Sequence, residues 1–157
     1  SLSEQISEKT CRREYLALCD GIFKEDAGRV ETYIGRSPAD RTKMAVVPKE
    51  KGRYAATNFE VVRRFAAGYT LVRFRLETGR THQIRVHCRH LGHPIVGDPV
   101  YGSKKQKFKL NGQLLHACRL ELTHPKTGER MAFEAPLPAY FSAVLEKLER
   151  EERGCAR

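Results

Sequence analysis

Apolar and polar residues alternate through the middle of the chain, a pattern typical of β-strands that are buried on one face. The alternation covers residues 57–61 and, more clearly, residues 70–76, and the small residues at 66–68 favour a turn between them. The second strand carries Val72, Phe74 and Leu76 on one face and Arg73 and Arg75 on the other. The pattern therefore predicts a hairpin in a sheet with one buried face and one basic face.

Four further apolar runs predict strands at residues 14–20, 29–34, 114–123 and 131–134. Gly21 closes the first run, because glycine readily adopts the backbone conformations of tight turns. The sequence His-Pro-Lys-Thr-Gly at residues 124–128 is a turn between the last two runs. We therefore expect the last two strands to run in opposite directions.

A spacing of three and four residues between apolar positions predicts two helices. The first covers residues 81–91, where Thr81 is expected to cap the N-terminus and Gly92 to end the helix. Its apolar face consists of Ile84, Cys88 and Leu91, and its neighbouring polar face consists of His82, Arg85 and Arg89. The second helix lies near the C-terminus, and its apolar face consists of Phe141, Val144, Leu145 and Leu148.

The order of these elements predicts an α+β fold, with a mixed, largely antiparallel β-sheet flanked by helices. The 157 residues correspond to one domain with a single core. Residues 1–9 are expected to form the end of a polar helix. Residues 35–53 contain glycine and proline and carry six Lys or Arg residues against two acidic residues, which indicates a basic loop.

The charge of the chain indicates that the protein binds a charged partner. The formal net charge is +10, and residues 73–109 alone carry nine Lys or Arg residues against two acidic residues. A strongly basic domain indicates a polyanionic partner, and nucleic acid is the first candidate. No apolar stretch approaches the ~18 residues that span a bilayer, so neither a membrane protein nor a membrane partner is expected.

The cysteines and the N-terminus indicate the compartment. The five cysteines are scattered and form no C-x-x-C pair, and the first ten residues lack the layout of a signal peptide. Such cysteines are typical of reduced thiols, and we expect a cytoplasmic protein. The sequence leaves a redox role of the cysteines and the oligomeric state open.

Residues 77–102 read ETGRTHQIRVHCRHLGHPIVGDPVYG. This stretch closely resembles the C-terminal signature of the RluA-type pseudouridine synthases, the family that isomerises uridine in ribosomal and transfer RNA. Three shorter stretches resemble, in the same order, the family's strand with an active-site tyrosine (9–21), its basic loop (34–47) and its closing strands (114–138). The resemblance implies an RNA-modifying isomerase that needs neither a cofactor nor a metal, with an active-site cleft across the sheet.

The resemblance also implies roles for single residues. Arg85 matches the arginine that pairs with the catalytic aspartate, and Tyr15 matches the tyrosine that packs on the target uracil. A guanidinium suits this pairing, because it offers a carboxylate a planar, two-pronged partner. The expected substrate-binding residues are Arg80, His82 and Gln83 around the site, Leu115 closing the base pocket, and Lys104 and Lys105 on phosphates.

One departure from the family concerns the nucleophile. The family's aspartate lies in a motif of the type H-R-L-D-x-x-T-x-G, and none of Asp20, Asp26, Asp40 and Asp98 has that context. Residues 1–157 are therefore expected to be the C-terminal portion of a catalytic domain, without a separate N-terminal RNA-binding domain. We expect this portion alone to be inactive and to need the upstream half of its own domain as a partner.

Two alternatives remain at this stage. The chain is an RNA-binding module that kept the scaffold and lost the chemistry, or a metal-dependent hydrolase that uses the histidines between positions 82 and 93. The metal hypothesis is weaker, because His87 and Cys88 fall on different faces of the predicted helix and no zinc-protease motif is present. The sequence does not distinguish ribosomal RNA from transfer RNA, and it does not identify the target uridine.

Overall fold

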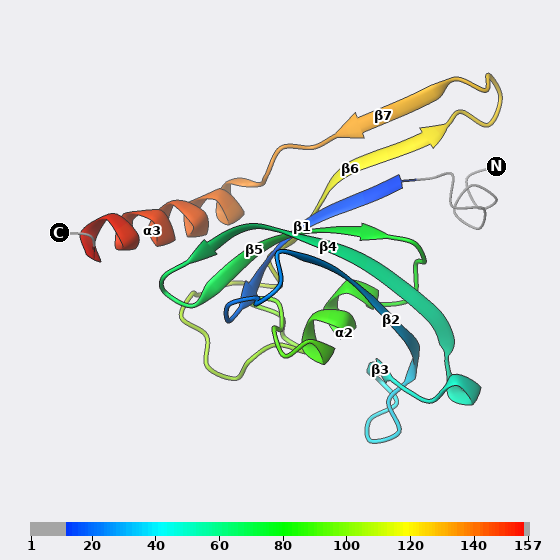
Figure 1. Ribbon diagram of the computed structural model, residues 1–157, viewed down its shortest axis with the longest axis horizontal. Coiled ribbons are helices and arrows are strands. Elements are labelled where there is room, and N and C mark those ends of the chain that lie inside the picture. Colours follow the sequence, from blue (N-terminus) through cyan, green and yellow to red (C-terminus); the bar gives the residue numbers. More distant parts are fainter. Residues whose placement is uncertain (1–11, 156–157) are drawn as a thin grey trace.

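Seven strands pair edge to edge in one sheet in the computed structural model, which describes residues 12–155 (Figure 1). The order across the sheet is β3-β2-β4-β5-β1-β6-β7, and every pair in this described part is antiparallel. The strands are β1 (Arg12–Asp20), β2 (Ala27–Arg36), β3 (Met44–Val46), β4 (Arg53–Phe65), β5 (Tyr69–Leu76), β6 (Leu115–Thr123) and β7 (Arg130–Glu134). The helices are the short 3₁₀ turn η1 (Lys49–Lys51), α2 (Gln83–His90) and α3 (Ala139–Cys155).

The predicted α+β class and the predicted hairpins are confirmed. In the β4–β5 hairpin the apolar residues face each other across the strands, as in the pairs Phe59↔Phe74 and Val61↔Val72. Gly68 turns the chain between these strands with φ of +99°, a conformation that a side chain would strain. Residues 35–53 form the predicted loop, but they also contain β3 and η1. The helix expected at residues 1–9 lies outside the described residues.

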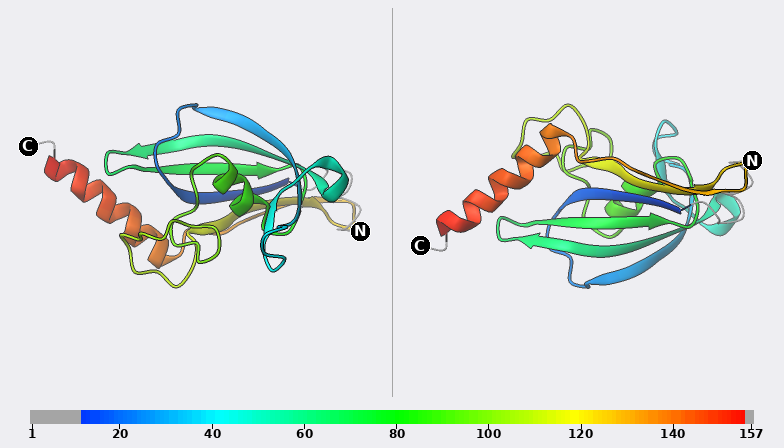
Figure 2. Two further views of the ribbon diagram at one scale, coloured as in Figure 1. Left: turned by 90° about the horizontal axis from the view of Figure 1, so that it is seen from below. Right: turned by 90° about the horizontal axis from the view of Figure 1, so that it is seen from above.

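The two longer helices pack on opposite faces of the sheet, because neighbouring residues of a strand point to opposite sides (Figures 1 and 2). Leu18 of β1 packs on one face with Phe141 and Leu148 of α3. On the other face, Ala17 packs with Ile84 of α2. This alternation places α2, which carries most of the predicted site residues, on the same face as the odd-numbered residues of β1. Within the described residues, no helix has the length and apolar composition to cross a membrane.

The start of α2 differs from the prediction. Thr81 does not cap the helix; His82 occupies the N-cap position with φ of +56° and no capping bond from its side chain. The turn is instead held by the buried Gln83, whose Oε1 accepts the backbone N–H of Arg80 and the hydroxyl of Thr78. The predicted end is correct, since Gly92 has φ of +83° directly after the helix.

Candidate functional site

Tyr15 and Leu115 lie on the face of the sheet that α2 covers. Leu115 is opposite Ala17 across the β1–β6 ladder, and Tyr15 points to the same side of β1 as Ala17. Both side chains pack against the buried cluster that contains Ile84 of α2. The structure therefore brings together the tyrosine of β1, the leucine of β6 and the start of α2.

A β-bulge adjusts this part of the sheet. The register between β1 and β6 shifts after Glu14, so that Cys118 of β6 is an extra residue beside Tyr15. Its thiol donates to the carbonyl oxygen of Glu14 over 3.4 Å. Bulges bend a strand locally, and they are frequent next to functional sites because they re-aim a side chain.

Arg85 is held by a carboxylate of its own chain. Its Nε donates to Oδ2 of Asp98 over 2.9 Å, and its Nη2 donates to Oδ1 over 2.8 Å. The side chain of Asp98 is fully buried, and that of Arg85 is 11% exposed. Burial opposes ionisation of Asp98, but Arg85 and two backbone N–H donors outweigh it and hold the pKa of the carboxyl below its ordinary value. The pair is therefore ionised at neutral pH.

The turn at residues 97–102 supplies both Asp98 and an aromatic ring beneath the arginine. Oδ1 of Asp98 accepts the backbone N–H groups of Val100 and Tyr101. The Tyr101 ring centre lies 5.1 Å from Cζ of Arg85, within the range of a cation–π contact. The sequence did not predict that Asp98 also pairs with Arg85, because the two residues are 13 positions apart and only the fold brings them together.

Tyr101 links α2 to the basic loop. Its hydroxyl accepts the backbone N–H of Met44 over 2.9 Å and lies 2.9 Å from Nδ1 of His82. Desolvation, and then the charge of Arg85, lower the pKa of His82, so its imidazole is neutral at pH 7. One face of the site is thus tied to the 35–53 loop through backbone and side-chain hydrogen bonds.

Gln83 and His87 of α2 are buried, and their polar atoms bond within the chain. Besides its two bonds at the start of the helix, Gln83 donates through Nε2 to Ala56 O and Thr57 Oγ1. The two ring nitrogens of His87 lie 2.8 Å from Thr32 Oγ1 and from Thr57 Oγ1. The structure therefore places Gln83 behind the site rather than on its surface.

The predicted cationic residues differ in how far their charges are neutralised. Arg80 donates through Nε to the carbonyl oxygen of Tyr54 over 2.7 Å, and desolvation and then Arg53 lower its pKa. Lys104 and Lys105 are exposed, and no ion pair involves them in the described part of the chain. Lys107 of the same run pairs with Glu151 of α3 at 2.6 Å. The lysine run consists of Lys104, Lys105, Lys107 and Lys109, and within the described residues only Lys107 of these four has an ion pair.

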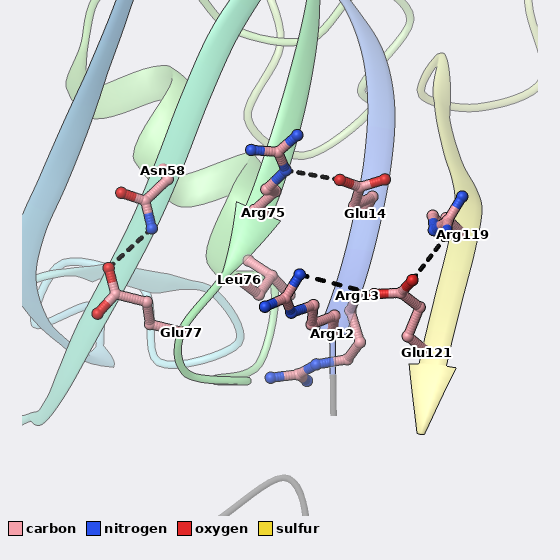
Figure 3. A pocket seen from close by; sticks show the side chains of 9 residues that line it. All are labelled: Arg12, Arg13, Glu14, Asn58, Arg75, Leu76, Glu77, Arg119 and Glu121. Carbon is pink, nitrogen blue, oxygen red and sulfur yellow. Dashed lines mark hydrogen bonds and ion pairs between the residues drawn. The ribbon is translucent and has the colours of Figure 1, made fainter. Parts of the chain in front are cut away.

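The opposite face of the sheet contains a polar hollow of about 670 Å³ (Figure 3). It is lined by Arg12, Arg13, Glu14, Asn58, Arg75, Leu76, Glu77, Arg119 and Glu121. Arg75 donates to Glu14 over 2.6 Å, and Arg119 donates to Glu121 over 2.6 Å. On the face that the sequence predicted to be basic, Arg75 is thus paired with a carboxylate from a strand that is distant along the chain, whereas no ion pair in the described part of the chain involves Arg73.

The metal-dependent alternative requires histidine and cysteine side chains that converge on one point. Among residues 12–155, no group of three or more His, Cys, Asp or Glu side chains is arranged to hold a metal ion. Cys19 and Cys88 are buried free thiols with their sulfur atoms 3.9 Å apart. His87, the most buried of the histidines, has both ring nitrogens within 2.8 Å of threonine hydroxyls.

Comparison with known proteins gives one consistent result. A family model described as RNA pseudouridylate synthase matches residues 1–90. The chain is 48% identical over 149 residues to an uncharacterized RNA pseudouridine synthase of Chloroflexus aurantiacus, covering 95% of the chain and 46% of that protein. It is 45% identical to ribosomal large subunit pseudouridine synthase D of Nitrosomonas europaea, covering 94% of the chain and 44% of that protein. The chain thus spans about half the length of these relatives.

Solved structures agree with the sequence comparison. The human RNA pseudouridylate synthase domain containing 1 superimposes with a TM-score of 0.75 and 26% identity, covering 95% of the chain and 70% of that structure. The human RNA pseudouridylate synthase domain containing 4 superimposes with a TM-score of 0.75 and 23% identity, covering 94% of the chain and 66% of that structure, and supports the fold alone. Both superpositions extend over nearly all of the chain, including the sheet on which the candidate site is built.

Proposed function

Because the chain belongs to the RluA-type family of RNA pseudouridine synthases, we propose that its parent protein converts uridine to pseudouridine in ribosomal or transfer RNA. The reaction breaks the bond from C1′ of the ribose to N1 of uracil and forms a bond from C1′ to C5. The proton on C5 is lost and N1 gains one, so the product is an isomer of the substrate. The reaction involves no net oxidation or reduction, and the proposal includes no cofactor.

The observation that carries this proposal is the anchored guanidinium of Arg85. Asp98 takes up Nε and one N–H of Nη2, and no described residue bonds to Nη1. A guanidinium can bind two carboxylates along two of its edges, since all of its nitrogens are donors. In our proposal the open edge of Arg85 pairs with the nucleophilic aspartate, and Asp98 occupies the other edge.

Tyr15 and Leu115 are proposed to hold the target base. A base in a folded RNA must leave its stack before its glycosidic bond can be attacked, and aromatic or apolar side chains then pack on it. Tyr15 and Leu115 are partly buried on one face, beside the apolar cluster of α2. His82 and Arg80 flank the start of α2 and are proposed to contact the RNA, together with Lys104 and Lys105.

The nucleophile itself is proposed to come from a segment upstream of residue 1. Asp98 is paired with Arg85, and Asp40 accepts hydrogen bonds from Thr42 in its own loop. Asp26 is exposed and pairs with Arg64, and Asp20 lies at the opposite end of β1 from Tyr15. Asp98 is thus already bonded to Arg85, and none of the other three carboxylates bonds to Arg85, so we propose that the chain alone is inactive.

This proposal predicts the outcome of a fragment test. Purified residues 1–157 and the full-length protein are each incubated with ribosomal RNA and transfer RNA, and pseudouridine is counted by nucleoside mass spectrometry. We expect product only from the full-length protein, because the fragment lacks the aspartate. Multiple turnovers by the fragment would show that the nucleophile lies within these residues.

A second prediction concerns Arg85. In the full-length protein, Arg85→Lys is expected to lower kcat by about 100-fold, because lysine keeps the charge but cannot bind two carboxylates with a planar fork. RNA affinity is expected to stay within about threefold, since one positive charge is retained. Equal losses of turnover and affinity would instead make Arg85 an ordinary RNA-binding residue.

The alternative of a non-catalytic RNA-binding module rests on the unpaired cations Arg80, Lys104 and Lys105. It requires that the full-length protein binds RNA without forming pseudouridine. The fragment test separates the two proposals, because only the enzyme proposal expects product from the full-length protein. Under either proposal the partner is RNA, and we propose a cytoplasmic location.

A further inference from the structure

We propose that Asp98 is a positioning residue, which fixes the guanidinium of Arg85 in the orientation that catalysis requires. The inference rests on the proposed function, because it takes Arg85 as the partner of the nucleophilic aspartate. Asp98 does not touch the substrate in this proposal, and it acts only through Arg85.

The geometry of the pair restricts the arginine to one orientation. Both oxygens of Asp98 are engaged, one by Nε at 2.9 Å and one by Nη2 at 2.8 Å. Two parallel hydrogen bonds fix the plane of the guanidinium, whereas a single bond would leave it free to rotate. The Tyr101 ring, 5.1 Å from Cζ, further limits the arginine on one side. The flexible side chain is thereby ordered before any substrate arrives.

Asp98 is itself held by the backbone of its turn. Its Oδ1 accepts N–H groups from Val100 and Tyr101, and its carbonyl oxygen accepts the N–H of Gly102. A Cβ atom at position 102 would collide with the Asp98 backbone, so the turn closes only with glycine there. The carboxylate that holds Arg85 is therefore a rigid anchor, which meets the general requirement that supporting groups hold a catalytic side chain in place.

The anchor leaves one edge of the arginine available. Nη1 has no partner among the described residues, and the Arg85 side chain retains 11% exposure while Asp98 has none. A second carboxylate can therefore approach the guanidinium without displacing Asp98. Without Asp98 the arginine would have to be ordered by the nucleophile alone, and we expect that loss to appear in turnover rather than in RNA binding.

The experiment uses the full-length protein and the variant Asp98→Asn. Asparagine keeps an oxygen that can accept the N–H groups of the turn, but it removes the charge and one of the two acceptors for Arg85. We expect kcat to fall by about tenfold or more, because misplacement of a catalytic group is costly. We expect KM for RNA to stay within about twofold. Glu121→Gln is the matched control, because Glu121 also binds an arginine, Arg119, but lies on the other face of the sheet.

A double-mutant cycle tests whether Asp98 acts through Arg85. If it does, Asp98→Asn adds little to the loss caused by Arg85→Lys, because the arginine that it orients is already absent. Multiplicative losses would show that Asp98 acts independently and would overturn the inference. Normal turnover of Arg85→Lys would instead reject the proposed role of Arg85, whereas a slow Arg85→Lys with an unaffected Asp98→Asn would reject only the inference.

The melting temperature of each variant is measured as a control for correct folding. If Asp98→Asn melts below the assay temperature, Asp98→Ser replaces it, since serine also caps backbone N–H groups. If neither variant folds, Asp98 is a folding residue and the positioning role is overturned.

Discussion

Gln83 and His87 lie one turn apart on α2, and both direct their polar side-chain atoms to partners inside the chain. Arg85, on the same helix, keeps Nη1 without a partner among the described residues. Residue type alone does not separate these cases, because each is a polar side chain within one continuous motif. Burial separates them: Gln83 and His87 are buried and bond to residues of the sheet, whereas Arg85 is partly exposed.

His87 predicts a pH dependence of stability. Desolvation lowers its pKa to about 4 in the folded chain, while the ordinary value is 6.5. The unfolded chain therefore takes up a proton first as the pH falls, and stability is lost from pH 6.5 down to pH 4. The loss amounts to about 3 kcal/mol, and it is absent above pH 6.5.

The measurement is urea unfolding of the isolated chain at pH 7, 5.5 and 4.5, compared with His87→Gln. Glutamine does not titrate, so the free energy of unfolding of this variant should fall less over the same range. Parallel pH curves for the two proteins would show that His87 is not the group responsible.

At the scale of elements, the strands were predictable and the start of α2 was not. Alternation of apolar and polar residues identified β4 and β5, because a half-buried strand repeats every two residues, and apolar runs identified β1, β2, β6 and β7. The short strand β3 was missed. The turn before α2 is held by the side chain of Gln83, which also reaches the backbone of β4, a contact that no local pattern encodes. The paired charges of the open sheet face were missed for the same reason, since Glu14 and Arg75 are 61 positions apart.

The role of Gln83 at the start of α2 leads to a prediction about stability. Gln83→Ala is expected to destabilise the isolated chain by about 2–4 kcal/mol, because it removes the four hydrogen bonds that this buried amide makes with Thr78, Arg80, Ala56 and Thr57. Thr81→Ala is the control and should change stability by less than about 0.5 kcal/mol, since Thr81 is exposed and is not the cap. Urea unfolding of the two variants shows whether Gln83 or Thr81 stabilises the start of α2. A larger effect at Thr81 would contradict the structure.

For the candidate site, the sequence identified Tyr15, Leu115 and Arg85, and the structure adds Asp98 and Tyr101. Tyr15 and Leu115 were found through the resemblance, and their common face follows from the β1–β6 ladder. The partner of Arg85 was not predictable, because the turn at residues 97–102 must first fold back against α2. Distant contacts of this kind set the limit of prediction from one sequence.

At the scale of the whole molecule, the positively charged side chains differ in whether a carboxylate neutralises them. Glu14, Glu77 and Glu121 neutralise arginines on the open face, while Lys104 and Lys105 have no ion pair among residues 12–155. RNA affinity should therefore depend more on the loop after α2, which contains Lys104 and Lys105, than on the face of the sheet opposite α2. This distribution gives the lysine run a measurable role.

The prediction is that Lys104→Ala combined with Lys105→Ala weakens RNA binding by the full-length protein. It should also lower the slope of log Kd against log salt by about 1–2, because each phosphate contact that is lost means that about one counterion fewer is released on binding. Lys107→Ala is the matched control and should change the slope less, since Lys107 is paired with Glu151. Fluorescence anisotropy over a salt series measures both slopes. Equal slopes for all proteins would remove the lysines from the interface.

The position of β1 in the sheet has a consequence for how the chain is made. β1 is the first strand described, yet it lies between β5 and β6, whose residues follow at 69–76 and 115–123. During synthesis, Ala17, Leu18 and Cys19 leave the ribosome long before the strands that bury them. Pairings between segments so distant in the chain form slowly, and the waiting strand is exposed to wrong partners. β1 can therefore complete its place in the sheet only after β6 has emerged.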